Sequence, residues 1–203
     1  DRPVRVYAAH LQHASDLSHT RSRLPGDEGA LQPLLARAAE RGVEVRPLSF
    51  TSHNIARDIR DLARVKRVDL VVMGWHKPIL RQGVLSGTVL SVMQECTAEV
   101  AVFIERNGPP WRKILVPYRD MKTDRAAVEV AARIGSEPGM GVTILHVVAD
   151  HRARSRGRIS DTTFPDGVRL KVVDASDPVE AAVREAREGY DLIVVGVARE
   201  WGT

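Results

Sequence analysis

Cysteine and aromatic residues are scarce in this sequence, and long apolar runs are missing. Cys96 is the single cysteine among 203 residues, so the chain can form neither an internal disulfide nor a cysteine-based zinc site. Aromatic residues make up 4% of the chain, which leaves few rings to stack bases and argues against single-stranded nucleic-acid binding. No apolar run approaches the roughly 18–20 residues of a membrane span, and no signal peptide is recognisable. These absences favour a globular chain in a reducing compartment.

The apolar residues and the charge point to a folded protein with an anionic partner. Apolar residues make up 43% of the chain, enough for a core, and the formal net charge is +4. A positive balance favours a nucleotide, a nucleic acid or a lipid surface as partner.

Short apolar runs alternate with helical patterns along the chain, which is typical of parallel α/β architecture. The run 107–111, which begins Asn-Gly-Pro-Pro, is the clearest linker. It predicts a first domain over residues 1–106 and a second over 112–203. The predicted strands are 4–10, 43–50, 68–73, 99–104, 113–117, 141–148, 168–173 and 192–195, and the predicted helices are 28–41, 51–66, 87–95, 123–134 and 177–188.

Two features of the first domain follow from these patterns. Thr51 or Ser52 is predicted to cap the helix that ends near Lys66. The strand 68–73 is apolar throughout, which predicts that helices cover both of its faces.

The two halves of the sequence repeat. VDLVVMG (68–74) matches YDLIVVG (190–196), and VRVYAAH (4–10) matches VTILHVV around His146. The repeat predicts two domains of one fold, incomplete at opposite ends: the first lacks a strand and helix before Val4, and the second lacks its last loop, helix and strand. The missing parts are expected from a longer parent protein, from the other copy or from a partner chain.

The loop between the strand ending at Gly74 and the helix beginning at Gly87 is a candidate phosphate site. Amide groups and the dipole at a helix start favour an anion, and glycine permits close approach. The Thr88 hydroxyl could donate to a phosphate oxygen, while Lys77 and Arg81 could add positive charge. A plain strand-to-helix connection is the alternative.

The spacing of this loop resembles the universal stress protein family. That family has Gly, two residues, Gly, nine residues, Gly and Ser or Thr between its fourth strand and fourth helix. Gly74, Lys77, Gly87 and Thr88 keep the spacing, with lysine where the family has its second glycine. The resemblance implies that the loop wraps a triphosphate. Lys77 either contacts the phosphates or blocks the close approach of the backbone.

The second half carries a possible second site. RKILVPYRD (112–120) resembles the family's first strand, which usually ends in an acidic residue near the adenosine. That position falls on Arg119, with Asp120 next to it. The later loop begins at Gly196, but Arg199 replaces its second glycine. The alternative is that this later loop only connects a strand to a helix and binds no ligand.

A wider resemblance covers nearly the whole chain. VYAAHLQHASDLSH (6–19), the run 51–77 and VLSVMQECTAEVAVFIERNG (89–108) look like the cytosolic C-terminal region of monovalent cation/proton antiporters of the Kef and plant cation/H+ exchanger type. His76-Lys77 after the fourth strand is typical of that group. The resemblance implies paired universal-stress-like domains behind a membrane transporter, and it is consistent with an abrupt start at Asp1.

We therefore expect an α/β protein with two tandem universal-stress-like, Rossmann-like parallel-sheet domains of the adenine nucleotide alpha hydrolase-like type. Its expected function is regulation of a Na+/K+–proton antiporter at the cytoplasmic face of the cell membrane, without enzymatic activity.

The expected ligand is ATP, AMP or a cyclic dinucleotide, and the expected partners are the upstream transporter and a second copy pairing through 99–104. A stand-alone ATP-binding stress protein and a ligand-free assembly module are the alternatives. The candidate ligand residues are Gly74, His76, Lys77, Gly87, Thr88 and Val89, with Arg119, Asp120 and Gly196 as the possible second site.

Other polar residues are interpreted as structural. His10, His13 and His19 lack metal-ligand convergence, so no metal site is predicted. His146 is expected to be a hydrogen-bonded structural residue. Asp69 and Asp191 precede core strands, at the sheet end opposite to where α/β sites lie, and are also interpreted as structural.

Overall fold

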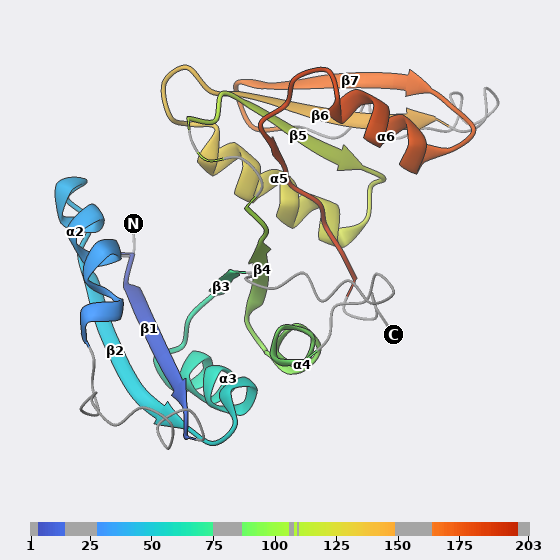
Figure 1. Cartoon of the computed structure of the whole chain (residues 1–203). Coiled ribbons are helices and arrows are strands. Elements are labelled where there is room, and N and C mark those ends of the chain that lie inside the picture. The colour runs from blue at the N-terminus through green and yellow to red at the C-terminus, as the bar shows by residue number, and fades with distance from the viewer. Residues whose placement is uncertain are drawn as a thin grey trace. The chain divides into compact units, whose positions relative to one another are not determined.

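The computed structural model describes residues 4–14, 28–74, 87–105, 108, 110–148 and 164–198. The chain divides into two compact units, with the division between Ile104 and Glu105. Both units are α/β, and every strand pair in them is parallel (Figure 1). The α/β class with parallel sheets, expected from the alternating pattern, is confirmed.

Unit 1 holds two separate pairs of strands, β1 with β2 and β3 with β4 (Figure 1). In the first pair Val6 lies beside Val45, and in the second Leu70 lies beside Glu99. The elements in chain order are β1 (Val6–His13), the 3-10 turn η1 (Glu28–Ala30), α2 (Gln32–Glu40), β2 (Val45–Ser52), α3 (Ile55–Lys66), β3 (Leu70–Gly74), α4 (Thr88–Glu95) and β4 (Glu99–Phe103).

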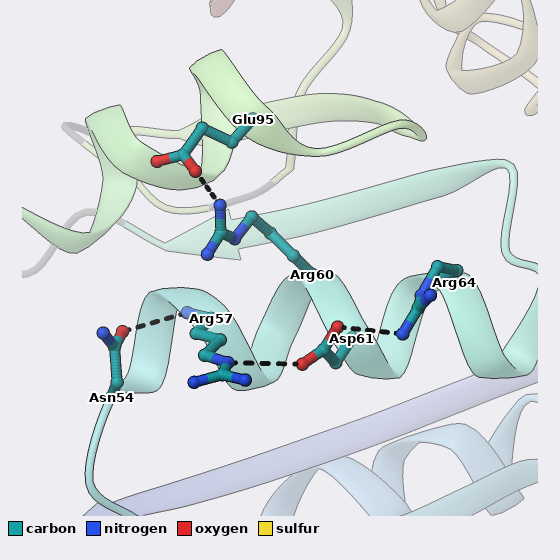
Figure 2. Close-up of polar contacts among 6 residues, drawn as sticks. All are labelled: Asn54, Arg57, Arg60, Asp61, Arg64 and Glu95. Carbon is teal, nitrogen blue, oxygen red and sulfur yellow. Dashed lines mark hydrogen bonds and ion pairs between the residues drawn. The ribbon is translucent and has the colours of Figure 1, made fainter.

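Helix α3 begins later than the sequence predicts. Asn54, rather than Thr51 or Ser52, is its N-cap, and the Asn54 side chain accepts a hydrogen bond from the Arg57 amide at 3.0 Å (Figure 2). The predicted cap is wrong because β2 continues in extended conformation through Ser52. Asparagine caps as well as serine or threonine, so the tertiary pairing of β2 decides between them.

The core of unit 1 lies between α3, α4 and the β3–β4 pair. Val92 of α4 and Cys96, the C-cap residue of that helix, are fully buried. Both pack with Ala56 and Ala63 of α3. An ion pair between Arg60 and Glu95 joins the two helices at their surface (Figure 2). Cys96 is thus a buried small residue.

One face of β3 differs from the sequence prediction. Val71 and Met73 pack on the α3–α4 cluster, but Leu70 is 43% and Val72 is 67% exposed on the other face. The prediction that both faces are covered is therefore wrong for the described residues of this unit. An apolar strand sequence indicates that both faces of the strand can be buried. It does not establish that both are buried in this unit.

Unit 2 has one continuous four-stranded sheet in the order β7-β6-β5-β8. The strand β5 lies inside the sheet, between β6 and β8. The elements are β5 (Lys113–Tyr118), α5 (Lys122–Ile134), β6 (Gly141–Val148), β7 (Val168–Asp174), α6 (Pro178–Ala186) and β8 (Leu192–Ile193).

Helices cover both faces of this sheet (Figure 1). On one face Ile114, Val116 and Ile144 are fully buried against α5. On the other face Lys171, which lies beside Leu145 in the register, bonds to Glu185 of α6 at 2.6 Å. Since successive strand residues point to opposite faces, α5 and α6 lie on opposite sides.

No helix among the described residues is both long enough and apolar enough to cross a bilayer.

Candidate functional site

The start of α4 is open as far as the described part of the chain is concerned. Gly87 is its N-cap, with φ 77° and ψ −141°, a conformation that favours glycine. Among the described residues, no side chain caps this helix start, and a Cβ added at Gly87 would have no atom within 4 Å. Gly87 and Thr88 are exposed and Val89 is half-buried. The first amides of an uncapped helix are available to an anion.

The predicted phosphate loop is described only at its two ends. Gly74 is the last residue of β3, and Gly87, Thr88 and Val89 open α4. His76 and Lys77 lie outside the described residues. The structure thus places the helix end of the predicted site at the carboxyl-terminal side of β3, where parallel α/β folds bind ligands.

In the second predicted site, the acidic residue Asp120 is hydrogen-bonded to neighbouring protein side chains. The hydroxyl of Tyr118 donates to Asp120 at 2.9 Å, and Arg125 donates to the same oxygen at 3.0 Å. The hydrogen bond from Arg125, followed by that from Tyr118, lowers the pKa of Asp120. Burial, reinforced by the hydrogen bond to Asp120, raises the pKa of Tyr118. Asp120 therefore stays ionised and is held by its own neighbours.

Helix α5 begins with a cap that the sequence reasoning missed. The Asp124 carboxylate accepts from the amides of Arg119 at 2.7 Å and Met121 at 3.1 Å. Asp124 is 6% exposed, so this carboxylate fills the space over the helix start. An acidic residue in the first turn of a predicted helix was the available signal.

Gly196, the third residue of the predicted second site, is packed against the same helix start. A Cβ at this position would lie 2.3 Å from the carbonyl oxygen of Thr123 and 2.8 Å from the amide of Asp124. Glycine is needed here so that the segment following β8 can pass the first turn of α5. The contact at Gly196 is thus made with the first turn of α5, by protein on protein. Arg199 lies outside the described residues.

His146 and Asp191 have structural roles, as predicted. The Nδ1 atom of His146 lies 3.1 Å from the carbonyl oxygen of Tyr118. The Asp191 carboxylate accepts from the amides of Arg112 at 2.8 Å and Lys113 at 3.0 Å, and these bonds lower its pKa.

An open cavity of about 500 Å³ lies elsewhere in unit 1. It is lined by Arg64, Arg67, Asp69 and Glu99, among others, near the amino-terminal ends of β3 and β4. This is the opposite end of the strands from the α4 start, and its charges are mixed. Within the described ranges no group of three or more histidine, cysteine or acidic residues is placed to hold a metal ion.

Comparison with known proteins places these features in a family. The family model described as "Universal stress protein family" matches residues 2–103, half of the chain. The chain is 30% identical over 187 residues to the Na(+)/H(+) antiporter NhaS5 of Synechocystis sp.. That alignment covers 86% of this chain and 27% of the antiporter, so the chain spans about a quarter of that relative's length.

A solved structure agrees on the fold. A universal stress protein from Archaeoglobus fulgidus matches with a TM-score of 0.55 and 14% identity, covering 94% of this chain and 76% of that chain. At this identity the likeness concerns the fold alone.

Proposed function

Because the chain belongs to the universal stress protein family, we propose that it is a regulatory region of a monovalent cation/proton antiporter, located at the cytoplasmic face of the cell membrane. The similarity to NhaS5 along most of the chain carries this proposal. A region that spans a quarter of such a relative is suited to regulate the transporter part of the same polypeptide. Binding, rather than catalysis, is the proposed activity.

The proposed ligand is an adenine nucleotide or a cyclic dinucleotide held at the start of α4. Support comes from Gly87 and Thr88, which lie at the carboxyl-terminal side of a parallel strand. Their amides are uncapped, and the space around them is open, as far as the structure describes the chain. Lys77, in the preceding loop, would add charge on the phosphate side. The start of α5 is not proposed as a second site, because Asp124 and Gly196 fill it.

Regulation would follow from differential binding. A nucleotide that binds one arrangement of the region better than another shifts the equilibrium by its difference in affinity. We further propose that a second copy pairs through β4, the strand Glu99–Phe103. Pairing through β4 would make the arrangement of the regulatory region depend on both copies of the chain.

The ligand proposal is tested by thermal shift of the purified chain with ATP, AMP and cyclic dinucleotides. One of them should raise the unfolding temperature in proportion to the logarithm of its concentration above Kd. Thr88→Trp should abolish the shift, because the bulky ring covers the helix start. Thr97→Trp, at an exposed position beyond the other end of α4, is the matched control and should keep it.

The outcomes separate the alternatives. If no nucleotide shifts the unfolding temperature, the chain is an assembly module, which sedimentation equilibrium would show as a dimer. If the nucleotide binds but does not change cation-driven proton exchange in membrane vesicles that contain the full-length protein, the regulatory role fails. A natural protein without membrane spans would instead support a stand-alone stress protein.

A further inference from the structure

The open cavity of unit 1 lies at the amino-terminal ends of β3 and β4, away from the start of α4. The two strands begin side by side, because the Glu99 amide donates to the carbonyl oxygen of Asp69 at 3.0 Å. The last turn of α3 contributes Ala63 and Arg64 to the lining. The volume of about 500 Å³ is within the range of small-molecule sites, roughly 300–1,000 Å³.

Arg67, the C-cap of α3, lines this cavity from a backbone conformation that favours glycine. Its φ and ψ are both 52°, in the left-handed region. In the repeat of VDLVVMG and YDLIVVG, the residue just before the match is Arg67 in unit 1 and Gly189 in unit 2, where φ is 87°. Unit 1 therefore carries a strained arginine where its repeat has an unstrained glycine. Such strain is concentrated at ligand-binding residues, which makes Arg67 a candidate ligand contact.

The cavity is lined by charged side chains that the protein leaves largely unpaired. Within the described ranges, no hydrogen bond or ion pair engages the side chains of Arg67, Asp69 and Glu99. Arg64 donates to Asp61 at 3.3 Å, but its side chain remains 74% exposed (Figure 2). The lining thus offers two guanidinium groups and two carboxylates to a ligand.

This balance of charges selects the class of ligand. The two carboxylates repel a phosphate or nucleotide, and the two guanidinium groups repel a metal ion. A molecule with one charge of each sign can pair with both kinds of group, and the carboxyl-terminal end of α3 also favours its positive charge. We propose that the cavity binds a small zwitterion of the amino-acid type, with its carboxylate on Arg67 and its ammonium group on Asp69 and Glu99.

The buried part of the lining indicates which side chain the ligand carries. Ala63 and Ala98 are 5% and 8% exposed, and Val68 between them in sequence is half-buried. These residues present apolar surface, which suits a short aliphatic side chain such as that of leucine or valine. Because the charged groups are exposed, each ion pair adds little, and the Kd is expected to be about millimolar.

The first experiment is an NMR titration of the chain with L-leucine. The amide signals of Val68 and Ala98 should shift and saturate, whereas that of Thr88 should not move. Two matched ligands each lack one charge: leucine amide has no carboxylate, and N-acetyl-leucine has no ammonium group. Each should bind at least about tenfold more weakly, since each loses its charge-assisted hydrogen bonds to one side of the cavity.

Variants of Arg67 separate binding from folding. Arg67→Gln keeps a side chain at the strained position and should weaken leucine binding by about tenfold or more. Arg67→Gly should also lose binding, but it should raise the unfolding temperature by about 2–5 °C, because glycine relieves the positive φ. Arg57→Gln is the control, because it removes the same charge at the other end of α3, and it should bind leucine as the parent chain does.

Thr97 separates this site from the proposed nucleotide site. Thr97 lines the cavity, so Thr97→Trp should abolish leucine binding and keep any nucleotide shift. Thr88→Trp should have the reverse effect. The two sites therefore succeed or fail independently of one another.

Four results would overturn the proposal. Leucine and valine could both leave Val68 and Ala98 unshifted at saturating concentration. The two single-charge ligands could bind as well as leucine, or Arg67→Gln could bind it unchanged. Finally, inorganic phosphate could cause the same shifts and displace leucine, which would make the cavity an anion site.

Discussion

The two units share repeated sequence segments but differ in how completely their described elements are held together. Unit 2 has one continuous sheet with β5 inside it, and its core residues Ile114, Val116 and Ile144 are fully buried. Unit 1 has two strand pairs, linked through α3, and leaves Val72 67% exposed. Among the described residues, unit 2 therefore has a sheet covered on both faces, whereas unit 1 leaves one face of β3 open.

The starts of two helices show the same contrast on a smaller scale. The start of α5 is closed by Asp124 and by the backbone at Gly196. The start of α4 has glycine as its N-cap and, within the described ranges, no capping side chain. An anion could bind where the protein leaves the amides unpaired, and not where its own carboxylate occupies them.

The largest expected difference between the units is in core packing. Ile144→Ala should lower the free energy of unfolding of unit 2 by about 2–5 kcal/mol, because it leaves a cavity in a closed core. Val72→Ala, at an exposed strand position of unit 1, should change stability by about 0.5 kcal/mol or less. Urea denaturation measures both, and equal losses would contradict the contrast drawn between the two sheets.

The close approach of Gly196, in the segment after β8, gives the next effect. Gly196→Ala should cost about 1–3 kcal/mol, since its Cβ would overlap backbone atoms of Thr123 that cannot rotate away. Gly141→Ala is the matched control, because the nearest atom, the carbonyl oxygen of Arg112, would lie at 4.0 Å. A stable Gly196→Ala protein would mean that β8 and α5 are less tightly packed than described.

Removal of the α5 cap should have an intermediate effect. Asp124→Ala leaves the amides of Arg119 and Met121 without their partner and should destabilise unit 2 by about 1 kcal/mol, within a range of roughly 0.5–2. Asp58→Ala is the comparison, because Asp58 is an acidic first-turn residue of α3 that does not serve as its cap. Thermal unfolding should separate the two variants; similar midpoints would argue against the capping role.

The smallest effect concerns pH. Burial opposes ionisation of Glu185, but the hydrogen bonds from Lys171 and Tyr190 outweigh it, so the pKa of Glu185 is lowered. A lowered pKa gives stability that is fully present above the unfolded value, about 4.3 in model peptides, and is lost as the pH falls through the folded value.

The hydrogen bond to Glu185 raises the pKa of Lys171, so its contribution is lost instead as the pH rises through that raised value. Glu185→Gln should flatten the acid side of the stability curve by less than about 1 kcal/mol, since Lys171 is half exposed. Glu40→Gln, which removes an exposed pair on α2, should leave the curve unchanged. An acid limb identical to that of the parent chain would rule out the Glu185 contribution.

Sequence reasoning located the elements well and their ends less well. The repeat of VDLVVMG in YDLIVVG correctly placed β3 and β8, and alternation correctly gave parallel sheets. It missed the cap of α3, because Thr51, Ser52 and Asn54 are all acceptable caps and only the length of β2 selects one. It also missed Asp124, whose role depends on a turn in which Asp120 adopts φ 63°.

For the candidate site, sequence placed Gly87 and Thr88 at a helix start and Asp120 at a strand end, and the structure agrees. It could not tell an open helix start from a filled one. That distinction depends on the Asp124 carboxylate accepting from the Arg119 amide and on Gly196 lying against Thr123. The second contact joins residues that are far apart in the sequence and meet only on folding.

The sequence by itself determined the α/β class, the repeat and the position of each strand, because periodicity and glycine placement are local properties of the chain. Only the tertiary structure decided which faces are buried and which helix start stays open. Burial and hydrogen-bond pairing depend on what the rest of the chain places beside a residue, and two copies of one motif can therefore differ in both.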